Sequence, residues 1–199
     1  MRLAHRHPGS GPEQRYPSLA RFVSRVLLAM VVTCIAAAAQ TNKPTEFQVK
    51  AAYLFNFGKF VKWPANNTSP SDTFNICVLG SDPFGEVLDS TVSGERIEGR
   101  KVTVRRVSSA AEAAGCRIAF VGRSEEGRLG AIMPALGRSP VLTVSDITGF
   151  VDREGIIEFV MDHDRVRFEV NLAAAQRAGL TLSSELLKVA TSVKGQSGD

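Results

Sequence analysis

The chain contains little of the chemistry on which enzymes and metal sites depend. Its 199 residues include only three histidines, three cysteines and one tryptophan. Beyond residue 39 the single histidine is His163, whereas a metal site needs three or four converging ligands. Neither a G-x-S-x-G nucleophile motif nor a phosphate loop ending in Gly-Lys-Ser/Thr is present. The sequence therefore predicts a protein that is not an enzyme, with no catalytic residue, no metal and no cofactor.

Two weaker chemical patterns stay open. Ser145-Asp146 follows an apolar run of strand length, and a Ser-His-Asp hydrolase would have to combine this pair with His163. The segment 80–85 lies between an expected strand and an expected helix, where a phosphate or carboxylate could bind. A tight turn is the simpler interpretation of that segment. The adjacent Glu125 and Glu126 indicate a solvated helix start, because neighbouring helical residues do not face each other.

The first 39 residues differ from the rest and are typical of a secretion signal. Arginines precede an apolar run from Val26 to Ala39, and this run ends in four alanines. That order is the one found in signal peptides, with cleavage expected after Ala39. An uncleaved membrane anchor is the alternative, although a spanning helix needs about 20 apolar residues. We predict a signal peptide at 1–39 and one domain at 40–199.

Charge and cysteine content fit this division. The leader holds five arginines and one glutamate of the chain's 24 Lys+Arg and 20 Asp+Glu, so the remainder is formally neutral. A neutral domain has no electrostatic attraction to nucleic acid, and no nucleic-acid partner is expected. Cys34 leaves with the leader, and Cys77 and Cys116 remain. In an exported protein the simplest expectation is a disulfide between them, and two buried free thiols are the alternative.

The pattern of apolar residues predicts the fold class. Strands alternate with helices and favour one layered α/β domain, with a largely parallel sheet, helices packed on it and a C-terminal β-hairpin. Asp82 is expected to cap one helix and Asn171 another. The expected helices are 46–63, 124–136, 172–178, 184–193 and one that begins at Pro83, with a short helix or turn at 108–115. The expected strands are 74–79, 102–107, 117–121, 141–144, 156–161 and 165–170.

Because the sequence contains almost none of the residue patterns found at catalytic sites, it favours a binding protein. Trp63 ends the first helix and Phe150 lies in a loop, so each could be a core residue or a partner contact. In the second hairpin strand, Arg167 and Glu169 alternate with apolar residues, and Asn171 follows. These five residues are our candidates for a partner surface.

Several ordered blocks resemble the YfiR family. They are Val49–Phe57 with Lys59–Pro64, Ile76–Gly80 with Asp82–Gly85, Pro140–Asp146 with Gly149 and Phe150, Val166–Asn171 with Arg177–Leu180, and Ser183–Leu187. Together they span most of residues 46–193.

The resemblance implies a periplasmic α/β protein that binds and represses a membrane-bound diguanylate cyclase, and thereby controls cyclic di-GMP and biofilm formation. It also implies that the family's structural disulfide falls on Cys77 and Cys116, and redox-responsive release is then expected. The partner could instead be another sensor protein, and a homodimer is possible. A periplasmic small-ligand-binding or sensor accessory protein is the alternative function.

Overall fold

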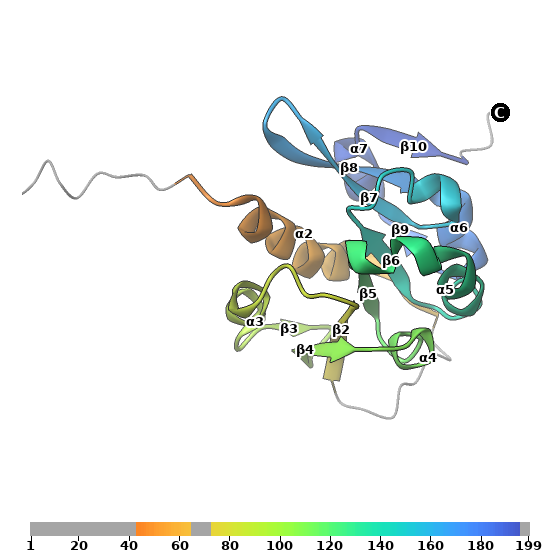
Figure 1. Cartoon of the computed structure of the whole chain (residues 1–199). Coiled ribbons are helices and arrows are strands. Elements are labelled where there is room, and N and C mark those ends of the chain that lie inside the picture. Colours follow the sequence, from red (N-terminus) through yellow and green to blue (C-terminus); the bar gives the residue numbers. More distant parts are fainter. Residues whose placement is uncertain (1–42, 65–72, 196–199) are drawn as a thin grey trace, which may run out of the picture. The chain divides into compact units, whose positions relative to one another are not determined.

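The computed structural model describes residues 43–64 and 73–195 (Figure 1). Contacts within the chain divide it into Met1–Lys43 and Pro44–Asp199. The predicted signal peptide and its cleavage site lie outside the described residues. Within the described ranges, no helix is long and apolar enough to cross a membrane.

The described segments contain both helices and strands in alternation. The helices, including two short 3-10 helices (η), are α2 (Glu46–Phe60), α3 (Glu86–Val92), α4 (Ala110–Ala113), η1 (Arg123–Arg128), α5 (Leu129–Leu136), η2 (Val151–Arg153), α6 (Leu172–Arg177) and α7 (Ser184–Val189). The strands are β1 (Val61–Lys62), β2 (Thr73–Leu79), β3 (Arg96–Ile97), β4 (Arg100–Val107), β5 (Ile118–Val121), β6 (Leu142–Ser145), β7 (Ile157–Asp162), β8 (Arg165–Asn171), β9 (Thr181–Leu182) and β10 (Ser192–Lys194).

In the described part of the chain, eight strands form one sheet. The sheet is mostly parallel, as the sequence predicted, and the short edge strands β3 and β10 were not predicted. The strand order is β10-β8-β7-β6-β5-β2-β4-β3, and β4, β2, β5, β6 and β7 run parallel. The chain passes from β2 to β4 on one side and then returns to β5 on the other. Such a reversal opens a crevice at the carboxyl ends of the two central strands.

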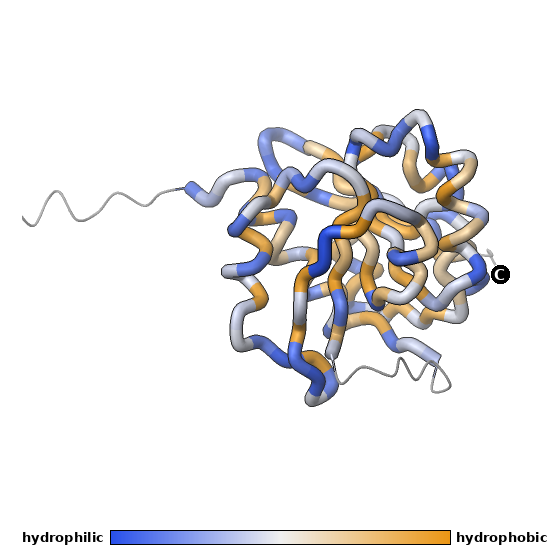
Figure 2. The backbone as a smooth tube through the Cα atoms, turned by 60° about the horizontal axis from the view of Figure 1, so that its bottom comes forward, coloured by the Kyte–Doolittle hydropathy of each residue, from blue (hydrophilic) through white to orange (hydrophobic). Residues whose placement is uncertain are grey.

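Helices cover both faces of the sheet and enclose two apolar cores. One core packs α2, α3 and α7 against the sheet, and the other packs α4 and α5 against its opposite face. Figure 1 shows α2 and α3 on one side of the strands and α4 and α5 on the other. The tube in Figure 2 is most apolar along the central strands and most polar in the outer turns. Strands buried on both faces explain the unbroken apolar runs in the sequence.

The predicted hairpin is confirmed. β7 and β8 pair antiparallel from Ile157–Val170 to Asp162–Arg165. His163 and Asp164 form the turn with φ of 46° and 58°. Positive φ at both central residues is the two-residue turn whose twist matches the flanking strands.

Two predicted helices are too long at their carboxyl ends. The first was expected to reach Trp63, but α2 ends at Phe60 because Val61 pairs with Leu182 in the small sheet of β1 and β9. The last was expected to reach Val193, but α7 ends at Val189 and β10 joins the sheet edge beside β8. In both places a strand partner distant in sequence takes the backbone hydrogen bonds.

Candidate functional site

A polar crevice lies where the sheet reverses direction. It has a volume of about 340 Å³ and opens at the carboxyl ends of β2, β5 and β6, beside the first turn of α2. Its size lies within the range of about 300–1,000 Å³ that is usual for small-molecule sites. The lining residues are Glu46, Phe47, Ser81, Asp82, Pro83, Arg123, Ser124 and Asp146. We call this cavity the polar crevice.

A buried lysine, Lys50, pairs with two residues that line the polar crevice. Lys50 is only 2% exposed, and its Nζ lies 2.7 Å from Asp146 Oδ2 and 2.5 Å from Glu46 Oε1. Asp146 Oδ1 lies 3.3 Å from Nε of the exposed Arg123. Lys50 Nζ also lies 5.1 Å from the centre of the Phe47 ring. Because a buried charge is tolerated only when it is paired, this network ties α2 to the end of β6.

The loop after β2 forms one wall of the polar crevice. The Ser81 N–H donates to Ser124 Oγ over 2.9 Å, which joins this loop to the start of η1. Gly80 has φ of 86°, and a Cβ there would collide with the Ser124 side chain. A glycine is therefore required at this close approach.

Asp82 does not cap a helix as predicted, so that prediction is wrong. Its Oδ1 accepts from the Phe84 N–H over 2.8 Å, which forms a local turn, and α3 begins only at Glu86 after Gly85. Its Oδ2 accepts from Arg106 Nε over 2.8 Å. This contact with Arg106, a residue of β4, holds the loop after β2 against that strand.

A second cavity, which we call the apolar groove, lies between α2, β8 and α7. It has a volume of about 470 Å³. Its lining residues are Tyr53, Asn56, Phe57, Phe60, Phe168, Glu185, Leu186 and Val189. Phe60 is 40% exposed and Val189 is 53% exposed. Two large exposed apolar side chains at the mouth of an aromatic cavity are typical of an interaction surface.

The structure separates the predicted partner-binding residues rather than gathering them. Trp63 is partly buried, with its ring centre 5.3 Å from that of Phe74. Phe150 is completely buried in the core on the α4 and α5 side and presents no surface. Sequence patterns did not distinguish these environments, because an aromatic residue at an element boundary can face either way.

The three predicted residues of β8 share one face of that strand. Arg167, Glu169 and Asn171 alternate with buried apolar residues and project away from the side of β8 that bears Phe168. Arg167 also donates a long hydrogen bond of 3.5 Å to the carbonyl oxygen of Val189, at the border of the apolar groove. Asn171 caps α6 as predicted, since its side chain accepts from the Ala174 N–H.

The arrangement required for a serine hydrolase is not formed. Ser145 is fully buried, and its Oγ donates to the Val121 carbonyl and accepts from the Ile147 N–H. Ser145 is in register with Glu158, and the hairpin tip lies beyond Asp162, about 13 Å farther along β7 at about 3.3 Å per residue. Among residues 43–64 and 73–195, no group of three His, Cys, Asp or Glu side chains is placed to hold a metal ion.

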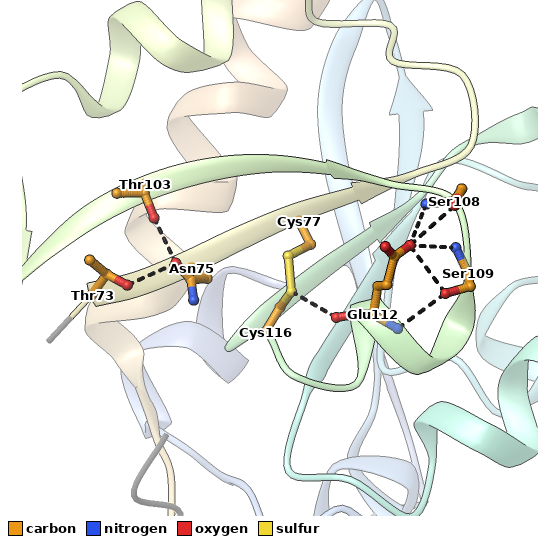
Figure 3. The surroundings of a disulfide bond; sticks show 8 residues. All are labelled: Thr73, Asn75, Cys77, Thr103, Ser108, Ser109, Glu112 and Cys116. Atoms are coloured by element: carbon orange, nitrogen blue, oxygen red, sulfur yellow. Dashed lines mark hydrogen bonds between the residues drawn. A yellow bond between two sulfur atoms is a disulfide. The ribbon is translucent and has the colours of Figure 1, made fainter. Parts of the chain in front are cut away.

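Cys77 and Cys116 form the expected disulfide (Figure 3). It joins the central strand β2 to the turn before β5, with 6.1 Å between the two Cα atoms, and both cysteines are buried. Glu112 organises the start of α4, the helix before this turn, by accepting hydrogen bonds from the N–H groups of Ser108 and Ser109. The hydrogen bond from Ser108 contributes most to lowering the pKa of Glu112.

The sequence did not predict the ion pair between Lys50 and Asp146 beside the polar crevice. A signal was present, because Lys50 interrupts the apolar face of the expected helix four residues after Glu46. Its partner Asp146 lies 96 residues away, and the sequence suggested only a catalytic role for that aspartate. Local patterns could not identify the pairing.

Comparisons with known proteins identify one family, and two of the solved structures that match are described below. A YfiR/HmsC-like family model matches residues 47–191, and no curated protein matches the chain. A conserved domain protein from Vibrio cholerae O1 biovar El Tor is 15% identical, with 61% of this chain and 55% of that chain covered and a TM-score of 0.47. The ABC domain in complex with L-Trp from Streptococcus pneumoniae is 15% identical, with 72% and 60% covered and a TM-score of 0.50. The chain thus spans 55–60% of the length of these two structures. At 15% identity, the likeness to the second structure concerns the fold alone.

Proposed function

The chain belongs to the YfiR/HmsC-like family, and from this premise we propose that it is a periplasmic regulatory protein that binds and represses an inner-membrane diguanylate cyclase. The family match over residues 47–191 is the observation that carries the proposal. A regulator of this kind needs no catalytic centre. It needs only to bind one state of its partner more tightly than the other, because a ligand shifts an equilibrium by its difference in affinity.

The apolar groove is our candidate for the surface that receives the partner. Its floor consists of the aromatic residues of α2 and β8, and the exposed Phe60 and Val189 stand at its edge. Asn56 and Glu185 add polar groups to the lining. An apolar centre with polar groups around it is the usual composition of a binding hot spot. We expect the periplasmic portion of the cyclase to insert apolar side chains here.

Charge substitutions at the groove test this proposal. We expect Phe60→Asp to abolish copurification of the tagged full chain with the membrane cyclase and to raise cellular cyclic di-GMP. Met161→Asp is the matched control, because Met161 is 54% exposed and lies outside the groove lining. An unchanged cyclic di-GMP level after deletion of the gene, with no cyclase copurifying, would contradict the proposed function.

The face of β8 that carries Arg167, Glu169 and Asn171 is a second candidate surface. Arg167→Glu introduces the opposite charge there, while the groove-lining residues keep their identity. If the cyclase copurifies with Phe60→Asp but not with Arg167→Glu, the interface lies on this face of β8 and not in the groove. The homodimer stays a prediction, and the mass of the purified protein by light scattering tests it.

Export is a separate part of the proposal. We expect the leader at 1–39 to direct the chain to the periplasm and to be removed after Ala39. The intact mass of protein from a periplasmic extract checks this directly. A full-length mass in the membrane fraction would instead support a tethered regulator.

The proposal also includes release of the partner when the disulfide is reduced. The disulfide between Cys77 and Cys116 is buried, so a reductant must wait for the fold to open before it reaches the sulfur atoms. Reduction would then weaken the fold and release the partner. Copurification with and without reductant, compared with a Cys77→Ala/Cys116→Ala variant, tests this step.

The polar crevice supports a second function, which is binding of a small ligand. It lies at the switch point of the sheet, where open α/β folds commonly bind ligands. Arg123 is 70% exposed in its side chain and has its Nε 3.3 Å from Asp146 Oδ1, so it could receive an anionic group. A thermal-shift screen of small carboxylates and phosphates tests this function. Stabilisation that persists in Arg123→Ala would place the ligand elsewhere.

A further inference from the structure

One helix lines both cavities. Glu46 and Phe47, in the first turn of α2, face the polar crevice. Tyr53, Asn56, Phe57 and Phe60, in its later turns, line the apolar groove. The 15 residues of α2 form one continuous helix without proline. A displacement at one end of such a helix is therefore passed to the other end.

A chain of side-chain contacts connects the two ends beneath the helix. Lys50 Nζ, held by Asp146, lies 5.9 Å from the centre of the Phe159 ring. Phe159 in turn packs against Tyr53 and Phe57, with ring centres 6.0 Å and 5.9 Å apart. Both of these rings contact Phe168 on the floor of the groove, at 5.5 Å and 5.1 Å.

The ion pair between Lys50 and Asp146 is the part of this chain that an occupant of the crevice would reach first. Asp146 lines the crevice and is shared between Lys50 and Arg123. A ligand that binds Arg123 or Asp146 changes the balance of charge around Lys50. Because a buried ammonium group must keep its partners, α2 has to follow any movement of these partners.

We propose that the polar crevice is an effector site whose state is transmitted by α2 to the apolar groove, with the Lys50–Asp146 pair as the link. The inference rests on the proposed function only for what the groove binds, since the coupling itself is a property of the chain alone. Coupling of two sites is reciprocal, so a partner in the groove also changes the affinity of the crevice for its ligand.

Hydrogen exchange of the full chain, processed as in the cell, tests the coupling without a cyclase or a ligand. The perturbation is Asp146→Asn, which removes one of the two carboxylate charges that hold Lys50 and keeps a hydrogen-bond acceptor of the same shape. Glu158→Gln is the matched control, because Glu158 is also a buried carboxylate near the end of β6, and it accepts from the Gly149 and Val151 N–H groups rather than from α2. Amides of β2 report any loss of global stability.

We expect Asp146→Asn to speed exchange at residues 53–60 relative to β2 by about threefold or more, within the range of coupling energies seen between distant sites. Glu158→Gln should leave that ratio unchanged. The fluorescent dye 1-anilinonaphthalene-8-sulfonate provides a second probe of the groove, with the signal lost in Phe60→Asp taken as the groove component.

Equal exchange ratios at 53–60 in Asp146→Asn and the wild-type chain would overturn the inference. So would a faster ratio in both Asp146→Asn and Glu158→Gln, because the effect would then reflect general loosening. A cyclase that fails to copurify would overturn the proposed function but would leave these exchange ratios untouched, so the two failures are distinguishable.

Discussion

Reducing the disulfide between Cys77 and Cys116 should destabilise the domain strongly. The bond closes a loop with a sequence separation of 39 residues. The chain-entropy relation assigns a loop of this length about 4 kcal/mol of stabilisation at 25 °C. Because single domains have a total stability of about 5–15 kcal/mol, this one bond accounts for a large share.

Urea unfolding of the oxidised and the reduced protein measures this contribution directly. With a slope of about 2 kcal/mol per molar urea, the loss corresponds to a fall of about 2 M in the unfolding midpoint. A reductant should leave the midpoint of a Cys77→Ala/Cys116→Ala variant unchanged, which controls for its effects on the solvent.

The rate of reduction provides an independent check. Since Cys77 is fully buried and Cys116 is 3% exposed, reduction of the folded protein should be slow and should accelerate as urea increases the open population. A midpoint shift below about 0.5 M urea, or fast reduction in the absence of urea, would refute the reasoning.

Three further predictions concern the polar crevice and its surroundings. Lys50→Met should lower the free energy of unfolding by about 3 kcal/mol, measured in urea, because it leaves the buried Asp146 without its main partner. Adding Asp146→Leu should recover most of this loss. A double variant as unstable as the single variant would contradict this account. Gly80→Ala should cost about 1–3 kcal/mol, since its φ of 86° is strained for alanine and the new methyl group has no room, and an unchanged melting temperature would show that the loop relaxes freely. The hydrogen bond from Arg106 lowers the pKa of Asp89, so the stability that this pair adds is present at neutral pH and is lost as pH falls below about 4. Between about pH 7 and pH 3, the free energy of unfolding should therefore fall less in Asp89→Asn than in the wild-type chain. An equal fall in both would exclude this pair as its cause.

Much of the fold could be predicted because short segments carried their own structural signals. Strand β5 and the last four residues of β2 are continuously apolar, which is expected where helices cover both faces of a parallel sheet. In β8 the alternation of Val166, Phe168 and Val170 with polar residues matches its buried and less buried faces. Asn171 begins α6 because a side-chain cap acts over only three residues.

The wrong predictions lie where a residue pairs with a segment that is distant in sequence. Val61 leaves the helical conformation to pair with Leu182, and Val193 pairs with Val170 at the sheet edge. Asp82 is a good capping residue by type, yet it turns toward the neighbouring Phe84 N–H and toward Arg106 on β4. Helix propensity is worth well under 1 kcal/mol per residue for ordinary residues, so such tertiary contacts override it.

The disulfide could be predicted from the sequence for a simple reason. Two cysteines in the expected domain allow only one internal pairing, and the structure contains it. The candidate partner residues were harder, because the environments of Trp63 and Phe150 depend on what packs above them. Phe150 is enclosed in the core, whereas the exposed groove residues Phe60 and Val189 are not among the predicted partner residues.

The sequence by itself determined the class of fold, the cysteine pair and the family, because periodicity, capping and ordered motif blocks are properties of neighbouring residues. Only the tertiary structure decided where the binding surfaces lie. Lys50 and Asp146 are 96 positions apart and meet because the sheet reverses direction beside β2. The apolar groove likewise joins α2 to β8 and α7, from opposite ends of the described chain. Surfaces of this kind depend on which elements pack together, and the packing is a property of the whole domain.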